Sequence, residues 1–257
     1  MKASIITVCK NSERCVEKAI QSVLMQSYND IEYIIIDGAS SDKTLSIIEK
    51  YKENIDVLIS EKDRGIYNAM NKGVIHSSGD VLYFLNSDDL LYDEDVINNV
   101  MSEFSRNSNL GVLYGNVIIS DGQNEKIVEY RNLTKRFFYK NNLCHQAVFS
   151  RKKVFNEIGN FNENYKIHAD IDWLMRAYFK TNTKFKYLDR IICIYSTLGF
   201  CSNPVNAQTY KFDRQKISAK YFFEAKFRLI IKQMLGKFGY KKYYYISKHR
   251  NGKLGVK

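Results

Sequence analysis

The sequence predicts an α/β protein with a mostly parallel central sheet, and three observations lead to this class. Short apolar runs of strand length alternate, along the first hundred residues, with segments whose apolar residues recur at helical spacing. One run, Val81–Leu85, is apolar throughout, as in a strand buried on both faces. Small polar or acidic residues follow each run. This alternation is typical of βαβ units, whose right-handed crossovers bring the carboxyl ends of the strands to one edge.

The first half of the chain contains four predicted strand–helix units. The predicted strands are Ala3–Thr7, Ile31–Ile36, Val57–Ile59 and Val81–Leu85. Helical spacing of apolar residues predicts the helices that follow them, around residues 16–24, 45–51, 67–74 and 96–104.

After residue 106 the pattern changes to a smaller antiparallel section. Two runs, Leu110–Ser120 and Glu125–Tyr130, flank a Gly-containing loop and predict a hairpin. The remaining predicted elements are a strand Cys144–Ser150, helices Lys152–Ile158 and Asp170–Phe179, and strands Phe185–Leu188 and Ile191–Ser196. We therefore expect one domain over residues 1–204, with halves at 1–105 and 106–204.

Composition excludes several classes of protein. The 257 residues are 45% hydrophobic, which suits a globular protein with a sizeable core. No apolar run approaches the roughly 18 residues that span a bilayer. The first residues turn polar too early for a signal peptide, so we expect a cytoplasmic protein. Five scattered cysteines without a Cys-x-x-Cys pair indicate neither a zinc site nor a disulfide framework.

The net charge of +11 is concentrated at the C-terminus. Residues 1–204 hold 25 basic and 26 acidic residues, whereas residues 205–257 hold 14 basic and 2 acidic ones. Apolar residues at helical spacing predict a basic helical extension over 205–257. It could pack on the body, bind an acidic partner or RNA, or lie on an anionic membrane. The spaced apolar residues are Phe223, Phe227, Ile230, Ile231, Met234 and Phe238.

Polar side chains stand where the predicted parallel strands end. Because these ends share one edge, Thr7, Asp37, Asp63 and Asp88 should lie close together, although each aspartate alone could be a helix cap. The chain lacks both Gly-x-Gly-x-x-Gly after the first strand and a P-loop. Carboxylates suit hydroxyls, base N–H groups and a divalent cation on a diphosphate, and Asp88 with Asp89 fits such a cation.

Several motifs carry a resemblance to a known family. The chain resembles a family 2 glycosyltransferase with the GT-A fold, densely over the first hundred residues and then more sparsely to about Ser202. The motifs are Ser4–Val8, Gln26–Tyr28, Ile36–Thr44, Glu61–Gly73, Leu85–Asp89, His145-Gln146 and Ala169–Trp173.

The resemblance implies roles for residues of the first half, which would bind the nucleotide-sugar. Thr7 and Asp37 would hold the base and ribose, Asp63 the base edge, and Arg64 the diphosphate.

Asn86-Ser87-Asp88 occupies the place of the family's Asp-x-Asp motif. Asp88 would ligate Mn²⁺ or Mg²⁺, and Asp89 would support it or contact the sugar. Asn86 replaces an aspartate that the family often has at this position, which removes one negative charge.

In the acceptor half, residues 106–204, the resemblance makes Asp170 the general base at the start of a helix. Ala169 stands where the family has a glutamate. His145 would orient the substrate or diphosphate. Asp170 could instead only cap its helix, and His145 could be a structural residue.

The expected function is metal-dependent, inverting transfer of a hexose from a nucleoside-diphosphate sugar with uracil as the expected base. The expected acceptor is a glycan or lipid-linked saccharide in polysaccharide biosynthesis, with peripheral contact at the cytoplasmic face of the membrane. Nucleic acid is not expected as a partner. One alternative is a sugar-nucleotide nucleotidyltransferase, although the stretch Thr7–Ser12 lacks that class's glycines. The other is a non-catalytic nucleic-acid-binding protein acting through the basic extension.

Overall fold

Nine strands form one mixed sheet in the computed structural model, which describes residues 1–199 and 204–222. Along the sheet the order is β3-β2-β1-β4-β8-β6-β9-β5, and β7 pairs with β6. The strands are β1 (Ala3–Cys9), β2 (Ile31–Asp37), β3 (Val57–Ser60), β4 (Val81–Phe84), β5 (Leu90–Leu91), β6 (Leu110–Ser120), β7 (Glu125–Val128), β8 (Val148–Arg151) and β9 (Lys184–Ser196).

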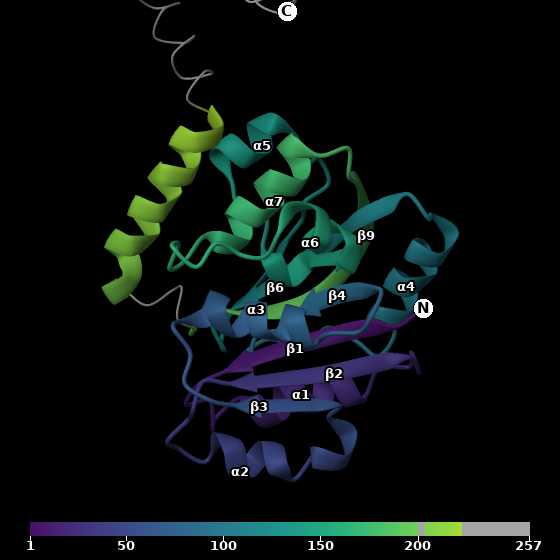
Figure 1. Ribbon diagram of the computed structural model, residues 1–257, viewed down its shortest axis with the longest axis vertical. Coiled ribbons are helices and arrows are strands. Elements are labelled where there is room, and N and C mark those ends of the chain that lie inside the picture. Colours follow the sequence, from purple (N-terminus) through teal and green to yellow (C-terminus); the bar gives the residue numbers. More distant parts are fainter. Residues whose placement is uncertain (200–203, 223–257) are drawn as a thin grey trace, which may run out of the picture. The chain divides into compact units, whose positions relative to one another are not determined.

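Helices connect the strands and cover the sheet (Figure 1). Helix α3 packs on β1 and β2, and α6 packs against α7 beside the later strands. The helices are α1 (Val16–Leu24), α2 (Thr44–Glu49), α3 (Ile66–His76), α4 (Val96–Arg106), α5 (Lys135–Lys140), α6 (Lys152–Ile158) and α7 (Ala169–Lys180), with short 3₁₀ turns η1 (Lys52–Asn54), η2 (His145–Ala147) and η4 (Pro204–Asn206).

The first four strands are parallel, as the sequence predicts. In Figure 1 they follow one another upward from β3 through β2 and β1 to β4. All residues of β1 and β4 are buried, which explains their apolar composition. Cys9 pairs with Asp37, and Asp37 with Ser60, so these three strands end level with one another. The predicted α/β class is therefore confirmed.

The second half differs from the prediction in detail. The expected strand Cys144–Ser150 is wrong at its start, where His145–Ala147 form η2 before β8 begins. The two expected late strands are one long strand, β9, whose pairing with β6 shifts register more than once. Neither β5 nor α5 was predicted. Helix α5 is only six residues long and is capped by the Thr134 side chain, so it carries little periodic signal.

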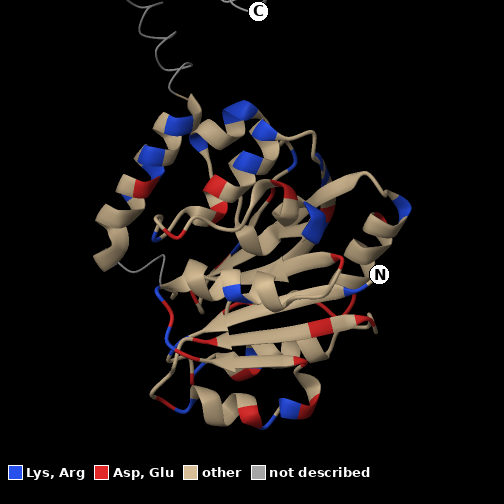
Figure 2. Ribbon diagram, viewed as in Figure 1, with Lys and Arg blue, Asp and Glu red and all other residues tan. Residues whose placement is uncertain are grey.

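The contacts divide the chain into two units, Met1–Asp213 and Arg214–Lys257. Within the first unit, Asp213 accepts hydrogen bonds from the backbone N–H groups of Lys166 (2.8 Å) and Ile167 (3.1 Å). Figure 2 shows acidic and basic segments interspersed over this unit, in keeping with the balanced charge of residues 1–204. The apolar positions Phe223–Phe238 lie outside the described residues, and the expected boundary at residue 204 stays a prediction.

Two further features concern the described residues only. No helix within residues 1–199 and 204–222 is both long and apolar enough to cross a bilayer. Cys9, Cys15, Cys144 and Cys193 are free thiols.

A buried carboxylate, Glu32, fastens the amino-terminal edge of the sheet. It accepts hydrogen bonds from the hydroxyls of Ser4 (2.5 Å) and Ser78 (2.5 Å) and from the backbone N–H of Ser78 (2.8 Å). Burial raises the pKa of Glu32, but these hydrogen bonds outweigh burial and hold the pKa below its ordinary value. The ionised form therefore stabilises the fold.

We expect Glu32→Gln to lower the free energy of unfolding by about 1.5–3 kcal/mol at neutral pH, because hydrogen bonds to a buried charge are lost. The folded-state pKa is depressed, so this contribution is present above the ordinary value of 4.5 and disappears as the pH falls through the folded-state pKa. Urea unfolding at several pH values measures it, with exposed Glu53→Gln as the control. If the difference in unfolding free energy between the wild type and Glu32→Gln grew as the pH fell, the assignment would be wrong.

Candidate functional site

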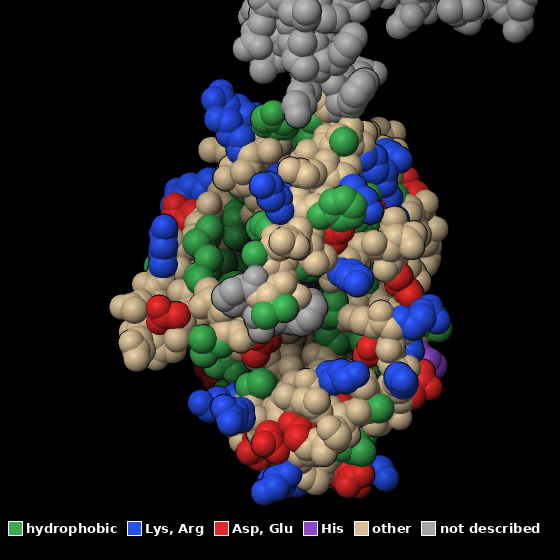
Figure 3. Space-filling model, turned by 90° about the vertical axis from the view of Figure 1, so that its left-hand side faces the viewer, with side chains coloured by type: hydrophobic (Ala, Val, Ile, Leu, Met, Phe, Trp, Pro, Cys, Tyr) green, Lys and Arg blue, Asp and Glu red, His purple; other side chains and the backbone are tan. Residues whose placement is uncertain are grey.

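The strand ends bring most of the predicted donor-site residues to the carboxyl edge of the parallel sheet. Asp37 ends β2, Asp63 follows β3, and Asn86 and Asp88 follow β4. Figure 3 looks onto this edge, where hydrophobic, acidic and basic side chains all reach the surface. The parallel register alone explains why residues separated by about fifty positions lie at the same edge.

Two of the residues expected to hold the base and ribose have buried side chains. The Thr7 hydroxyl is 3.2 Å from the hydroxyl of Tyr33. The Asp37 carboxylate accepts hydrogen bonds from the Ser60 hydroxyl (2.6 Å), the Ser40 backbone N–H (3.1 Å) and the Ser40 hydroxyl. Asp37 therefore shapes the loops that follow β2 and β3.

Asp63 lies directly against the turn after β2. Its Oδ1 accepts a hydrogen bond from the backbone N–H of Gly65 (2.9 Å). Its Oδ2 occupies the space that a Cβ atom at Gly38 would need, so a larger residue at position 38 would displace the Asp63 carboxylate. The structure thus brings Asp37-Gly38 and Asp63 together, as a shared base-binding edge requires.

Arg64 contacts the acceptor half of the protein. Its guanidinium donates to Glu163 (2.8 Å), and the Arg64 side chain is 78% exposed. The same Glu163 carboxylate accepts from the amides of Asn68 (3.1 Å) and Asn71 (3.0 Å) on α3. Glu163 therefore joins the two halves. Sequence reasoning missed it because it lies in a loop without a pattern, and the role of Arg64 toward a diphosphate stays a prediction.

Asn86 and Asp88 present oxygen atoms that suit a hard cation. The Asn86 Oδ1 atom is buried and has no hydrogen-bond partner within residues 1–199 and 204–222. Burial raises the pKa of Asp88, while its own backbone N–H and the charge of His145 oppose that rise. Gly199 approaches Asp88 so closely that a Cβ there would collide with the carboxylate.

These two side chains fit a divalent cation only together with oxygens of the substrate. The described residues contain no group of three or more His, Cys, Asp or Glu able to hold a metal. Mg²⁺ is commonly bound by one or two carboxylates plus substrate phosphates, and Asp88 with the Asn86 carbonyl meets that requirement. The cation would then neutralise charge on the diphosphate.

Asp89 has a structural role that the sequence did not specify. The fully buried carboxylate accepts hydrogen bonds from the Gln146 side chain (2.7 Å) and from the backbone N–H of Ser196 (2.8 Å). Burial and the charge of Asp88 raise its pKa. Asp89 thus joins the end of β4 to η2 and β9, and these bonds hold in place the segments that carry Asp88 and His145.

The candidate base, Asp170, is paired with two side chains. Its Oδ2 lies 3.0 Å from Nδ1 of His145, and its Oδ1 lies 2.8 Å from the hydroxyl of Tyr67, which also bonds to the backbone carbonyl of Ile167. The carboxylate bonds to these side chains and is not a simple helix cap. Tyr67 is a residue that sequence reasoning missed, and its position within Glu61–Gly73 was the available signal.

Asp170 is ionised at neutral pH. Burial raises the pKa of its carboxyl group, but the hydrogen bond and charge of His145, with smaller contributions from His168 and Tyr67, hold the pKa below its ordinary value. The charge of His145 also acts on Asp88 and Asp89. The imidazole therefore bonds to the carboxylate of α7 and acts electrostatically on the two carboxylates that follow β4.

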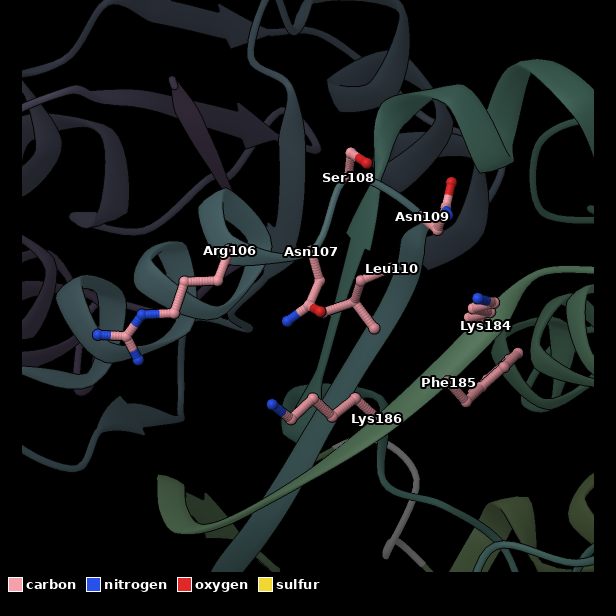
Figure 4. Close-up of a pocket in the computed structure, with 8 residues that line it drawn as sticks. All are labelled: Arg106, Asn107, Ser108, Asn109, Leu110, Lys184, Phe185 and Lys186. Atoms are coloured by element: carbon pink, nitrogen blue, oxygen red, sulfur yellow. The ribbon is translucent and has the colours of Figure 1, made fainter.

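A separate cavity of about 440 Å³ lies at the opposite edge of the sheet, where β6 and β9 begin. Its basic side chains are partly neutralised, since Lys186 pairs with Glu103 (2.5 Å). Figure 4 shows Arg106 directed away from Lys184, so the cations do not converge on one point. The lining residues are Arg106, Asn107, Ser108, Asn109, Leu110, Lys184, Phe185 and Lys186.

The fold and this edge together define a class of protein. A parallel nucleotide-binding sheet ends in acidic side chains, and a mixed section adds a carboxylate–imidazole pair close to them. This is the arrangement of a nucleotide-sugar-dependent transferase. The sequence matches the family Glycosyl transferase family 2 over residues 4–203, and the chain belongs to that family.

Curated relatives are glycosyltransferases. The chain is 31% identical over 205 residues to a PGL/p-HBAD biosynthesis glycosyltransferase of Mycobacterium bovis, and the match covers 79% of each chain. It is 28% identical to the chondroitin synthase of Escherichia coli, covering 94% of this chain and 34% of that protein. This protein is therefore a glycosyltransferase, which favours sugar transfer over both alternatives considered from the sequence.

Solved structures share the fold. S. aureus TarS residues 1–349 in complex with UDP-GlcNAc superposes with a TM-score of 0.71 at 20% identity, covering 86% of this chain and 67% of that one. The mannosyltransferase PcManGT from Pyrobaculum calidifontis, in complex with GDP-Man and Mn²⁺, gives a TM-score of 0.62 at 13% identity, covering 87% and 64%. The chain thus spans about two thirds of each, and the expected GT-A type of fold is confirmed.

Proposed function

We propose that this glycosyltransferase is metal-dependent and inverting, and that it transfers a hexose from a UDP-sugar to a glycan or lipid-linked saccharide. The observation that carries the proposal is that the carboxylate of Asp170 bonds to His145, whose charge also acts on Asp88. Asp88 can hold a cation that neutralises the departing diphosphate, while Asp170 lies where the attacking hydroxyl would lose its proton. The two structural neighbours in complex with nucleotide-sugars support a donor of that class, and the one that holds UDP-GlcNAc supports uracil as the base.

In the donor half, the loops after β2 and β3 would receive the nucleoside. Asp63 and the backbone around Gly38 form the close approach at which a base edge can bind. A divalent ion held by Asp88 and the Asn86 carbonyl would supply positive charge to the diphosphate.

The reaction would be a single displacement at the anomeric carbon. The acceptor oxygen forms a bond to that carbon on the face opposite the diphosphate, and the bond to the diphosphate breaks with its electron pair. The configuration therefore inverts. The hydroxyl proton passes to the pair formed by Asp170 and His145, which lies in the acceptor half.

We also propose that the basic C-terminal segment contacts an anionic membrane on its cytoplasmic face, where lipid-linked acceptors reside. Residues 223–257 contain 10 basic residues and 1 acidic residue. Each basic residue near an anionic surface contributes about 1 kcal/mol to binding.

The donor-site assignment predicts metal-dependent stabilisation by UDP. At about 100 times the dissociation constant, UDP with Mn²⁺ should add about 2.7 kcal/mol, or roughly 5 to 10 °C in melting temperature. Asp88→Asn should remove the metal-dependent part of this shift. Exposed Asp30→Asn is the control, and GDP in place of UDP tests the base. An equal shift in EDTA would rule out the metal role.

The acceptor-site assignment predicts that Asp170→Asn lowers the turnover number for sugar transfer by about 10²–10⁴ and leaves UDP–Mn²⁺ binding nearly unchanged. The change removes the ionised carboxylate that pairs with His145. The measurement is the turnover of UDP-sugars by the wild type and by Asp170→Asn, together with calorimetric titration of each with UDP. Retention of more than a few per cent of the rate would remove Asp170 from this role.

The membrane proposal predicts that the full chain sediments with anionic vesicles and that a chain ending at residue 222 does not. Loss of the basic residues removes the electrostatic attraction to the surface. Vesicles of a neutral lipid serve as the control, and raised salt should release the full chain. Equal binding of both forms to anionic vesicles would refute the idea.

A further inference from the structure

The buried carboxylate of Asp213 holds the loop that leads into α7. Asp213 is only 3% exposed, and its Oδ2 atom accepts hydrogen bonds from the backbone N–H groups of Lys166 (2.8 Å) and Ile167 (3.1 Å). Backbone N–H groups of a loop lack the partners that a helix or a sheet provides, so a side chain has to supply them. Hydrogen bonds to an ionised acceptor are roughly twice as strong as those between neutral groups. Asp213 therefore fixes the backbone just before α7 begins.

The loop that Asp213 holds leads directly to Asp170. Helix α7 begins at Ala169, so Asp170 lies in its first turn, three positions after Ile167. The carbonyl of Ile167 contacts the hydroxyl of Tyr67, and the same hydroxyl lies 2.8 Å from the Asp170 carboxylate. The position of this loop thus sets both the backbone that carries Asp170 and a side chain that contacts its carboxylate.

A second residue of the same helical turn, Tyr210, contacts the segment that leads to His145. The Tyr210 hydroxyl accepts a hydrogen bond from the side-chain amide of Asn142 (3.1 Å), three positions before His145. The Tyr210 ring also packs edge-on against His168, with the ring centroids 4.3 Å apart. The family match ends at residue 203, so these contacts come from a part of the chain beyond it. One turn of helix there, which carries Tyr210 and Asp213, contacts both segments that lead to the carboxylate–imidazole pair.

We propose that Asp213 is a positioning residue for Asp170. Its carboxylate holds the N–H groups of residues 166 and 167 so that Asp170 lies where the acceptor hydroxyl loses its proton. This inference rests on the function proposed above, in which Asp170 and His145 form the pair that receives that proton. A displacement of about 1 Å at a reacting group can cost about 10²-fold in rate, so a residue that contacts only the supporting loop can control turnover.

Three substitutions in the full chain separate geometry from charge. Asp213→Ala removes the acceptor and should lower the turnover number by about 10- to 100-fold. Asp213→Glu keeps the charge but carries the carboxylate one methylene group further, so it should also lower the turnover number. Asp213→Asn loses the charge but keeps an oxygen that can accept both bonds, so it should stay within about threefold of the wild type. The KM for the UDP-sugar and the affinity for UDP–Mn²⁺ should stay within about twofold in all three variants.

The assay is UDP release from a panel of UDP-sugars with Mn²⁺, using water and simple saccharides as acceptors. Glu32→Gln is the matched control, because Glu32 is also a buried carboxylate that accepts a backbone N–H but lies at the opposite edge of the sheet. It should lose stability without losing turnover. Wild-type turnover in Asp213→Ala and Asp213→Glu would overturn the proposal, and so would a lower turnover in Asp213→Asn than in Asp213→Glu. A parallel loss of turnover and UDP–Mn²⁺ binding would show a purely structural role and would also overturn it.

A double-mutant cycle tests whether Asp213 acts through Asp170. In the Asp170→Asn background, Asp213→Ala should lower the residual rate by less than about threefold, because the carboxylate that it positions is already gone. An equal loss in both backgrounds would overturn the proposal. A wild-type protein that turns over no nucleotide-sugar, or an Asp170→Asn variant with the wild-type rate, would instead refute the proposed function.

Amide hydrogen exchange provides a test that does not depend on turnover. The N–H groups of Lys166 and Ile167 should exchange at least about tenfold more slowly in the wild type than in Asp213→Ala, because the variant lacks their acceptor. If Asp213→Ala does not fold, Asp213→Glu provides the same comparison. Rapid exchange of both amides in the folded wild type would overturn the proposal, since Asp213 would then not hold the loop.

Discussion

The site depends on one buried interaction, the hydrogen bonds that Gln146 and Ser196 donate to the carboxylate of Asp89. A fully buried carboxylate requires such donors, because an unpaired charge in the interior is very costly. Asp89 follows the last parallel strand, whereas Gln146 and Ser196 belong to the mixed half. By satisfying Asp89 the fold therefore brings the two halves together, and the neighbours Asp88 and His145 are placed as a consequence.

A second connection holds the halves together at the surface. Glu163 accepts hydrogen bonds from Asn68 and Asn71, and Asn71 in turn is bonded to the backbone of Phe161. The loop before α7 is thus attached to α3, the helix that also supplies Tyr67. This attachment orients the start of α7 and with it Asp170.

Sequence patterns were sufficient for the parallel half and insufficient for the rest. β4 is uniformly apolar and β1 is interrupted only by Ser4 and Thr7, so both strands and the acidic residues after β4 could be located from the chain alone, although β1 ends two residues later than predicted. The η2 turn was read as a strand because its apolar neighbours continue into β8, and the backbone hydrogen bond from Ala147 to Cys144 reveals the turn. Contacts between distant loops, such as those of Glu163, leave no periodic signal and require the structure.

The buried carboxylates at this edge give a physical reason for the proposed cation in donor binding. The charge of His145 acts on Asp88, Asp89 and Asp170, and burial disfavours the ionised forms of all three. A diphosphate approaching this edge would add negative charge to carboxylates that already oppose one another. A divalent ion that binds together with the diphosphate would replace this repulsion at Asp88 by an attraction.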